Sequence, residues 1–224
     1  MRATTVIDVA PAQGRTTTCP PPESRRLLVV CSHPFDVTHA LGGVIAAFAA
    51  AGTVVQIVCL THEPGPDPER RRRPGDAAEL LQATRLLGAR EAVLLDHGAA
   101  HLQWNPPETL ACELRSVAGP VDAVLTVDAR APGAHPDLVR AMRAARRVGA
   151  RLHCPVYGWV PGPEAAAAAD VPPLLAGRAD GMIPVDCDRA RQRAAIACQG
   201  APGAEDPVLS LSGADRPRDL LTVL

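Results

Sequence analysis

The sequence lacks a charge imbalance, a sizeable aromatic content and lysine. Its 224 residues carry 23 basic and 24 acidic side chains, which gives a net charge of −1 at pH 7. Without a basic excess, the chain has no electrostatic reason to bind nucleic acid or an anionic membrane surface, and we expect neither partner. Aromatic residues make up only 2% of the chain, so the core must be built mainly from Val, Leu, Ile and Ala.

Signals for export, membrane insertion and disulfide bonding are also missing. No apolar stretch reaches the about 18 residues that a membrane helix needs, and the N-terminal region has no continuous apolar segment typical of a signal peptide. The seven cysteines are odd in number and form no Cys-x-x-Cys pair, which argues against a disulfide framework and a zinc ribbon. We therefore expect a cytoplasmic protein with reduced cysteines.

The pattern of the chain predicts a flexible tail followed by one α/β domain. Residues 1–24, rich in Thr and Pro, are expected to be the tail, and residues 25–224 to form the domain. Within the domain, short apolar runs alternate with segments of helical periodicity. This alternation favours a Rossmann-like three-layer fold, with a mostly parallel sheet covered by helices on both faces. Strands are expected at 26–32, 53–61, 91–96, 121–128 and 151–160, helices at 39–52, 76–89, 106–119 and 136–150, and one more strand and helix within 181–199.

Polar side chains follow the predicted strands at one edge of the predicted sheet. Each alone is more readily explained as a loop or capping residue. In open α/β sheets, however, ligands bind beyond the carboxyl ends of the strands, so the shared placement predicts a site at this edge. In chain order, these residues are His33 and Asp36, then His62, then Asp96 and His97, and finally Asp128, His135 and Asp137.

Several stretches, taken in order, resemble the PIG-L/LmbE-like N-deacetylases. They are "HPFDVTHALGG", "CLTHEPG", "AAELLQATRLLGA" and "GAHPDLVRA", and "RARQRAAIACQ" resembles the closing helix of bacterial members. The resemblance covers roughly residues 26–199. It implies the family's α/β fold and the activity of a zinc hydrolase that removes acyl groups from amino sugars and related small molecules.

The resemblance also implies roles for individual positions, and two of these positions depart from the family pattern. The two zinc ligands of the family's first motif carry over to His33 and Asp36. The general base that lies between them in the family is replaced by Phe35, and the third zinc ligand is replaced by Leu138. The histidine associated with stabilising the oxyanion is retained as His135.

These departures predict weak zinc binding. A catalytic zinc site uses three protein ligands and a water, so His33 and Asp36 alone would hold the metal at low occupancy. General-base help contributes about 10²–10⁴-fold in rate, and a phenylalanine cannot supply it. A substitute third ligand could come from His39, one helical turn after Asp36, or from His62 or Asp128 at the same edge. We expect no cofactor, with zinc as the one candidate.

The apolar replacements instead predict a pocket with a changed use. We predict a repurposed, metal-independent site that acts on a small-molecule metabolite in specialised biosynthesis. The alternatives are a zinc-dependent N-deacetylase with an altered ligand set and a non-catalytic relative that binds a small molecule or a partner. The sequence leaves the oligomeric state open. The predicted catalytic residues are His33, Asp36 and His135, and the predicted pocket residues are Phe35, His39, His62, Asp128, Asp137 and Leu138.

Overall fold

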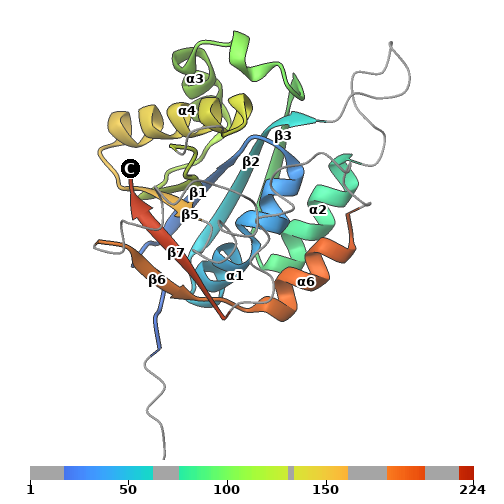
Figure 1. Ribbon diagram of the computed structural model, residues 1–224, viewed down its shortest axis with the longest axis vertical. Helices are drawn as coiled ribbons and strands as arrows, with labels where there is room; N and C mark the ends of the chain where they lie inside the picture. Colours follow the sequence, from blue (N-terminus) through green and yellow to red (C-terminus); the bar gives the residue numbers. More distant parts are fainter. Residues whose placement is uncertain (1–17, 63–75, 131–133, 161–180, 200–216) are drawn as a thin grey trace, which may run out of the picture.

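The fold is built around one mixed β-sheet. The computed structural model describes residues 18–62, 76–130, 134–160, 181–199 and 217–224. Within these ranges, seven strands lie in the order β3-β2-β1-β4-β5-β7-β6, and helices cover both faces (Figure 1). All neighbours from β3 to β5 are parallel, which confirms the predicted mostly parallel α/β architecture.

The inner parallel strands are apolar along most of their length because they are buried on both faces, whereas β3 lies at the edge of the sheet and is only partly buried. In β1, for example, every residue after Arg26 is buried. The five parallel strands are β1 (Arg26–Cys31), β2 (Val54–His62), β3 (Glu91–Gly98), β4 (Ala123–Val127) and β5 (Val156–Val160).

The helices form two outer layers, and their buried apolar side chains belong to two clusters. One layer contains α1 (Gly42–Ala50), α2 (Asp76–Leu87) and α6 (Arg189–Ala197), and these helices pack on the larger cluster. The other layer contains α3 (Pro107–Val117) and α4 (Pro136–Leu152), which lie together on the opposite face (Figure 1). This is the predicted three-layer arrangement.

Three elements differ from those expected. The helix expected at 39–52 is divided into a π-helical turn, η1 (Asp36–Ala40), and α1, because Leu41 N–H donates to the Asp36 carbonyl five residues earlier. The strand expected at 151–160 is shorter, since α4 continues through residue 152. A strand at the end of the chain, β7 (Arg218–Val223), was not predicted. It lies antiparallel between β5 and β6 (Ile183–Asp186).

The predicted tail is described only in its last residues, because residues 1–17 lie outside the described part of the chain. Cys19 and Asp186 exchange two hydrogen bonds, from Cys19 N to Asp186 Oδ2 at 2.7 Å and from Asp186 N to the Cys19 carbonyl at 2.8 Å. Ser24 Oγ donates to Asp122 Oδ1 at 2.6 Å. Residues 18–24 are thus hydrogen-bonded to the domain.

The strand order fixes where a site is expected. From β1 the chain moves outward to β2 and β3, whereas β4 and β5 lie on the other side of β1. The junction between β1 and β4 is therefore the topological switch point, where ligands bind in open α/β sheets. No helix among the described residues is long and apolar enough to cross a membrane.

Candidate active site

Two His-Pro segments leave the sheet at the switch point. The first segment (His33–Asp36) follows β1, and the second segment (His135–Leu138) follows β4 and begins α4. Because β1 and β4 are parallel neighbours, their carboxyl ends lie side by side. The predicted catalytic residues of both segments therefore lie after neighbouring strands at one edge of the sheet.

In both segments the histidine ring is fixed by the backbone two residues later. Phe35 N–H donates to His33 Nδ1 at 3.3 Å, and Asp137 N–H donates to His135 Nδ1 at 3.3 Å. A ring nitrogen that accepts a hydrogen bond carries no proton, so the neutral ring carries its proton on Nε2. Each histidine thus has an Nε2–H donor.

Asp36 closes the turn of the first segment. Its Oδ2 accepts from Ser32 N at 2.9 Å, from Ser32 Oγ at 2.6 Å and from His33 N at 2.9 Å. The side chain is buried, and three donors converge on one of its oxygens, an arrangement that favours the charged form of a carboxylate. Asp36 therefore holds His33 in place at the end of β1.

Phe35 lies between two imidazole rings. Its ring centroid is 5.2 Å from that of His33 and 5.7 Å from that of His39, where the arrangement is edge-on. Phe35 is buried, yet it belongs to neither apolar cluster of the core. His39 is oriented in turn by Thr38, whose Oγ1 lies 3.0 Å from its Nδ1. The phenylalanine thus packs on histidines of the site.

A buried network of two glutamines holds the first segment and the turn that follows it. Gln192 Nε2 donates to the carbonyls of Thr38 at 2.8 Å and His39 at 3.1 Å. Gln199 Nε2 donates to the Pro34 carbonyl at 3.0 Å, and Thr38 Oγ1 donates to its Oε1. Both glutamines belong to the C-terminal segment that resembles the family's closing helix, but sequence reasoning assigned neither of them to the site.

The glycine pair of the first family motif makes room for this network. A Cβ on Gly43 would lie 2.3 Å from Arg189 Nη1, and one on Gly42 would lie 3.0 Å from Gln192 Cγ. Arg189 is buried and forms a two-bond ion pair with Asp219 of β7, at 2.8 and 3.0 Å. The glycine pair was therefore the available sequence signal for a close approach of α6.

The two histidines expected after β2 and β3 lie within them, His62 as the last residue of β2 and His97 near the end of β3, and each pairs with an acidic side chain. His62 Nε2 lies 3.3 Å from Asp96 Oδ1, and the His62 side chain is buried. His97 Nε2 lies 2.7 Å from Glu113 Oε2 of α3. Both pairs lie on the β2–β3 side of the switch point.

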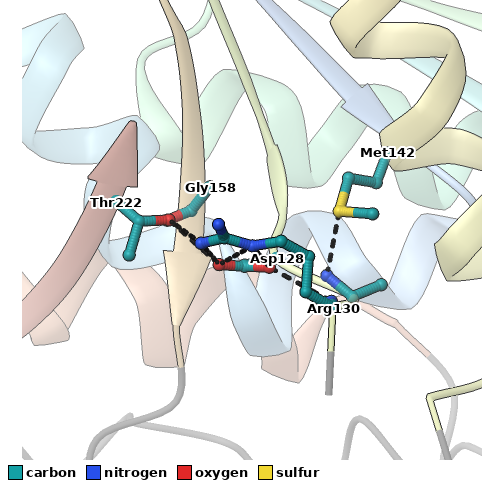
Figure 2. A network of polar contacts seen from close by, with 6 residues as sticks. Asp128, Arg130, Met142, Gly158 and Thr222 are labelled. Carbon is teal, nitrogen blue, oxygen red and sulfur yellow. Dashed lines mark hydrogen bonds and ion pairs between the residues drawn. The ribbon is translucent and has the colours of Figure 1, made fainter. Parts of the chain in front are cut away.

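Asp128, at the end of β4, is committed to an ion pair (Figure 2). Arg130 donates from Nε and Nη2 to both carboxylate oxygens, at 2.6 to 3.1 Å, and Thr222 Oγ1 of β7 donates at 3.0 Å. Burial alone would raise the pKa of the Asp128 carboxyl, but the hydrogen bonds and charge of Arg130 outweigh it and hold the pKa below its usual value. Asp128 therefore has a structural partner of its own.

The second segment holds a neighbouring loop and ends in the core. The Asp137 carboxylate accepts from Ala100 N at 2.7 Å and from Leu102 N at 3.0 Å, in the connection that follows β3. Leu138, to which the sequence resemblance assigns the position of a third zinc ligand, is buried in the same apolar cluster as Val37.

The described residues do not fit the zinc ion of the family. They include no group of three His, Cys, Asp or Glu side chains that could hold a metal ion. The unprotonated nitrogen of His33 accepts from Phe35 N–H, whereas zinc needs such a nitrogen for itself. Asp36 Oδ2 already accepts three hydrogen bonds, and the third position holds Leu138.

Residues 28–148, more than half of the chain, match the family model described as PIG-L, GlcNAc-PI de-N-acetylase. The chain belongs to the PIG-L family. This confirms the resemblance found in the sequence motifs. No curated protein sequence matches the chain.

Solved structures of this family's fold resemble the protein at low sequence identity. The A40926 pseudoaglycone deacetylase Dbv21 is 19% identical with a TM-score of 0.58, over 90% of this chain and 98% of that one. The 4-carboxy-2-hydroxymuconate hydratase GalB from Pseudomonas putida KT2440 is 20% identical with a TM-score of 0.54, over 89% and 95%. The N,N'-diacetylchitobiose deacetylase from Pyrococcus horikoshii is 23% identical with a TM-score of 0.44, and the match covers 57% of this chain and half of that one. At these identities the first two likenesses show the fold alone.

Proposed function

We propose that this PIG-L family protein has a repurposed, metal-independent site for a small-molecule metabolite. The site lies at the switch point between β1 and β4. Its substrate carries a carbonyl or carboxylate oxygen next to an apolar group. His33 and His135 donate their Nε2–H groups to that oxygen, and Phe35 contacts the apolar group.

The paired hydrogen bonds at Nδ1 carry this proposal. A histidine prepared to bind zinc donates its second ring nitrogen to a carbonyl or carboxylate. Here both Nδ1 atoms accept a backbone N–H instead, at the same distance in the two segments. Two neutral imidazole donors, held by backbone groups on neighbouring strands, are suited to stabilising negative charge on an oxygen.

Phe35 supports the choice of ligand. It occupies the position of the family's general base, and its ring packs against two imidazoles. A carboxylate at this position would add an unpaired charge beside the acceptor side of His33, whereas a phenyl ring offers apolar contact and excludes water. The fold is also found in a hydratase besides deacetylases, so it is not limited to acyl removal.

Histidine NMR tests the proposal directly. In protein labelled with ¹⁵N at its histidine rings, we expect His33 and His135 to show the Nε2–H tautomer in the presence of EDTA. Benzoate, as the probe, should shift both Nε2 signals, and its binding should be lost in His33→Ala and in His135→Ala. His153→Asn is the matched control, because His153 lies exposed at the far end of α4.

The alternative functions give different results in the same experiment. Stoichiometric zinc in purified protein, together with release of acetate from N-acetylglucosamine, would establish the zinc-dependent N-deacetylase. Benzoate binding that is unchanged in both alanine variants would overturn the site itself. Melting curves of each variant separate loss of binding from loss of folding.

A further inference from the structure

Trp104 is exposed in a chain that buries its other aromatic side chains. The sequence has five aromatic residues, namely two Trp, one Tyr and two Phe. Four of them are at most 8% exposed, whereas Trp104 is 76% exposed. An aromatic side chain is the largest contribution to burial that a residue can make, so leaving this one in solvent forgoes much stabilisation. Its exposure therefore needs a reason outside folding.

The connection that carries Trp104 is firmly held on its N-terminal side. The Asp137 carboxylate accepts from Ala100 N–H and Leu102 N–H, and the Leu102 side chain is fully buried. Ala100 adopts a left-handed conformation, with φ of 63°, which a non-glycine residue keeps only where its surroundings enforce it. Trp104 thus follows a fixed backbone.

The connection is equally held at Trp104 itself. Arg140 of α4 donates from Nη2 to the Gln103 carbonyl at 2.7 Å. Trp104 N–H donates to the His101 carbonyl at 3.2 Å, and Asn105 Nδ2 donates to the same carbonyl at 3.3 Å. Because the backbone is held on both sides of Trp104, binding of a ligand to the indole would order only the side chain, which has two χ angles.

Asp137 connects this aromatic group to the candidate active site. Its backbone N–H fixes the ring of His135, while its carboxylate holds the connection after β3. β3 also ends at the carboxyl edge of the sheet, the edge where both His-Pro segments lie. One residue in the first turn of α4 thus holds the ring of His135 and, through Ala100 and Leu102, the backbone that leads to Trp104.

We propose that Trp104 is a specificity-determining residue that stacks on a flat aromatic ring of the substrate. This inference rests on the proposed function, because it assumes that His33 and His135 bind the substrate's oxygen. It adds the chemical class of the substrate, an aromatic compound with a carboxylate or carbonyl group beyond the ring. The exposed face of the indole then has a defined partner.

Tryptophan fluorescence tests the inference, because the two tryptophans of the chain differ in exposure. Trp104 is 76% exposed and Trp159 is 1% exposed, so acrylamide should quench mainly Trp104. We expect 2-naphthoate to protect Trp104 from acrylamide and acetate to leave quenching unchanged. The same titration with cyclohexanecarboxylate, which has no flat ring, should give little protection.

Variants separate stacking from the rest of the site. Since aromatic pairing contributes about 0.5–1.5 kcal/mol, Trp104→Ala should weaken 2-naphthoate binding about 3- to 10-fold, measured by calorimetry, and Trp104→Phe should restore most of it. Acetate binding should be the same in all three proteins. Leu81→Ala, which removes an exposed side chain from α2, is the control and should change neither.

Each other outcome overturns a defined claim. If Trp104→Ala binds 2-naphthoate as the wild type does, the stacking role is wrong while the proposed function stands, provided that His33→Ala and His135→Ala still lose binding. If neither histidine variant changes binding, the proposed function fails. If Trp104→Ala alters only self-association in sedimentation, the indole belongs to a contact between copies, and the stacking role is again wrong.

Discussion

The two His-Pro segments fix their histidines identically but use their aspartates differently. In both, the backbone N–H two residues after the histidine donates to Nδ1 at 3.3 Å. The Asp36 carboxylate of the first segment accepts hydrogen bonds from backbone N–H groups of its own turn. The Asp137 carboxylate of the second segment accepts them from the connection after β3. A local hydrogen bond therefore orients the histidine ring in both segments. The role of the aspartate depends on which donors surround its carboxylate.

The segments also differ in the elements that they pack against. The first continues into a π-helical turn with two carbonyls that accept hydrogen bonds from Gln192, and the Pro34 carbonyl of the segment itself accepts one from Gln199. The second begins α4 directly, with His135 as the N-cap and Leu138 in the apolar core. The first segment thus depends on the far end of the chain, while the second depends on α4 and its neighbours. Four experiments address this difference.

Removal of the aspartate should cost most in the first segment. Asp36→Ala leaves Ser32 N, Ser32 Oγ and His33 N without their acceptor in a buried turn, which should lower the free energy of unfolding by about 3–5 kcal/mol. Asp137→Ala releases only two backbone donors, of which the Ala100 N–H is part-buried, and should cost about 1–2 kcal/mol. Urea unfolding measures both, with Asp36→Asn as a milder variant. Equal losses would contradict the difference between the segments.

Introducing the family's third zinc ligand into the second segment should restore zinc binding. Leu138→His supplies the third ligand beside His33 and Asp36, and we expect zinc affinity to rise by about 100-fold, measured by competition with a chelator. Leu81→His, on exposed α2, is the control for adventitious binding by an added histidine. If both variants bind zinc equally, the second segment does not face the first in the way that the family motif requires.

The contribution of the Gln192 hydrogen bonds to stability should be measurable separately. Gln192→Ala removes the donor to two carbonyls of the π-helical turn and leaves Arg189 with one partner fewer. We expect a loss of about 2 kcal/mol in the free energy of unfolding and a changed ring signal of His39. Gln103→Ala, at an exposed glutamine, should cost less than about 0.5 kcal/mol. A Gln192→Ala variant as stable as the wild type would show that the turn forms without α6.

The smallest effect concerns Asp128, at the start of the connection to the second segment. Its folded pKa is lowered, so its contribution to stability is present above the unfolded pKa of about 3.9 and is lost as the pH falls through the folded value. Asp128→Asn should therefore cost about 1 kcal/mol at pH 7 and less at pH 3. A gap that stays constant between these pH values would contradict a paired carboxylate at this position.

The sequence was a good guide wherever the signal was local. Alternating apolar runs predicted the parallel strands, and the ordered motifs predicted the PIG-L family, which the family match confirms. Strand order alone places His33 and His135 after neighbouring strands. The roles of the site residues stay predictions until they are tested by experiment.

Other features gave no local signal. The last strand, β7, is a short run whose place between β5 and β6 depends on pairing with residues far away in the chain. Neither Gln192 nor Gln199 could be assigned, because a polar residue on a helix reads as solvent-exposed until its neighbours are known. The commitment of Asp128 to Arg130 and Thr222 likewise involves the end of the chain (Figure 2).

The sequence by itself determined the fold class through its periodicity and the family through its ordered motifs, and the resemblance to that family implies that Phe35 and Leu138 replace a base and a zinc ligand. Only the tertiary structure decided which distant groups engage Asp128 and Asp137, where the buried glutamines lie and which aromatic side chain is left in solvent. Those properties depend on hydrogen bonds and contacts between segments that are distant in the chain. Such contacts exist only in the folded chain, so they cannot be read from local sequence patterns.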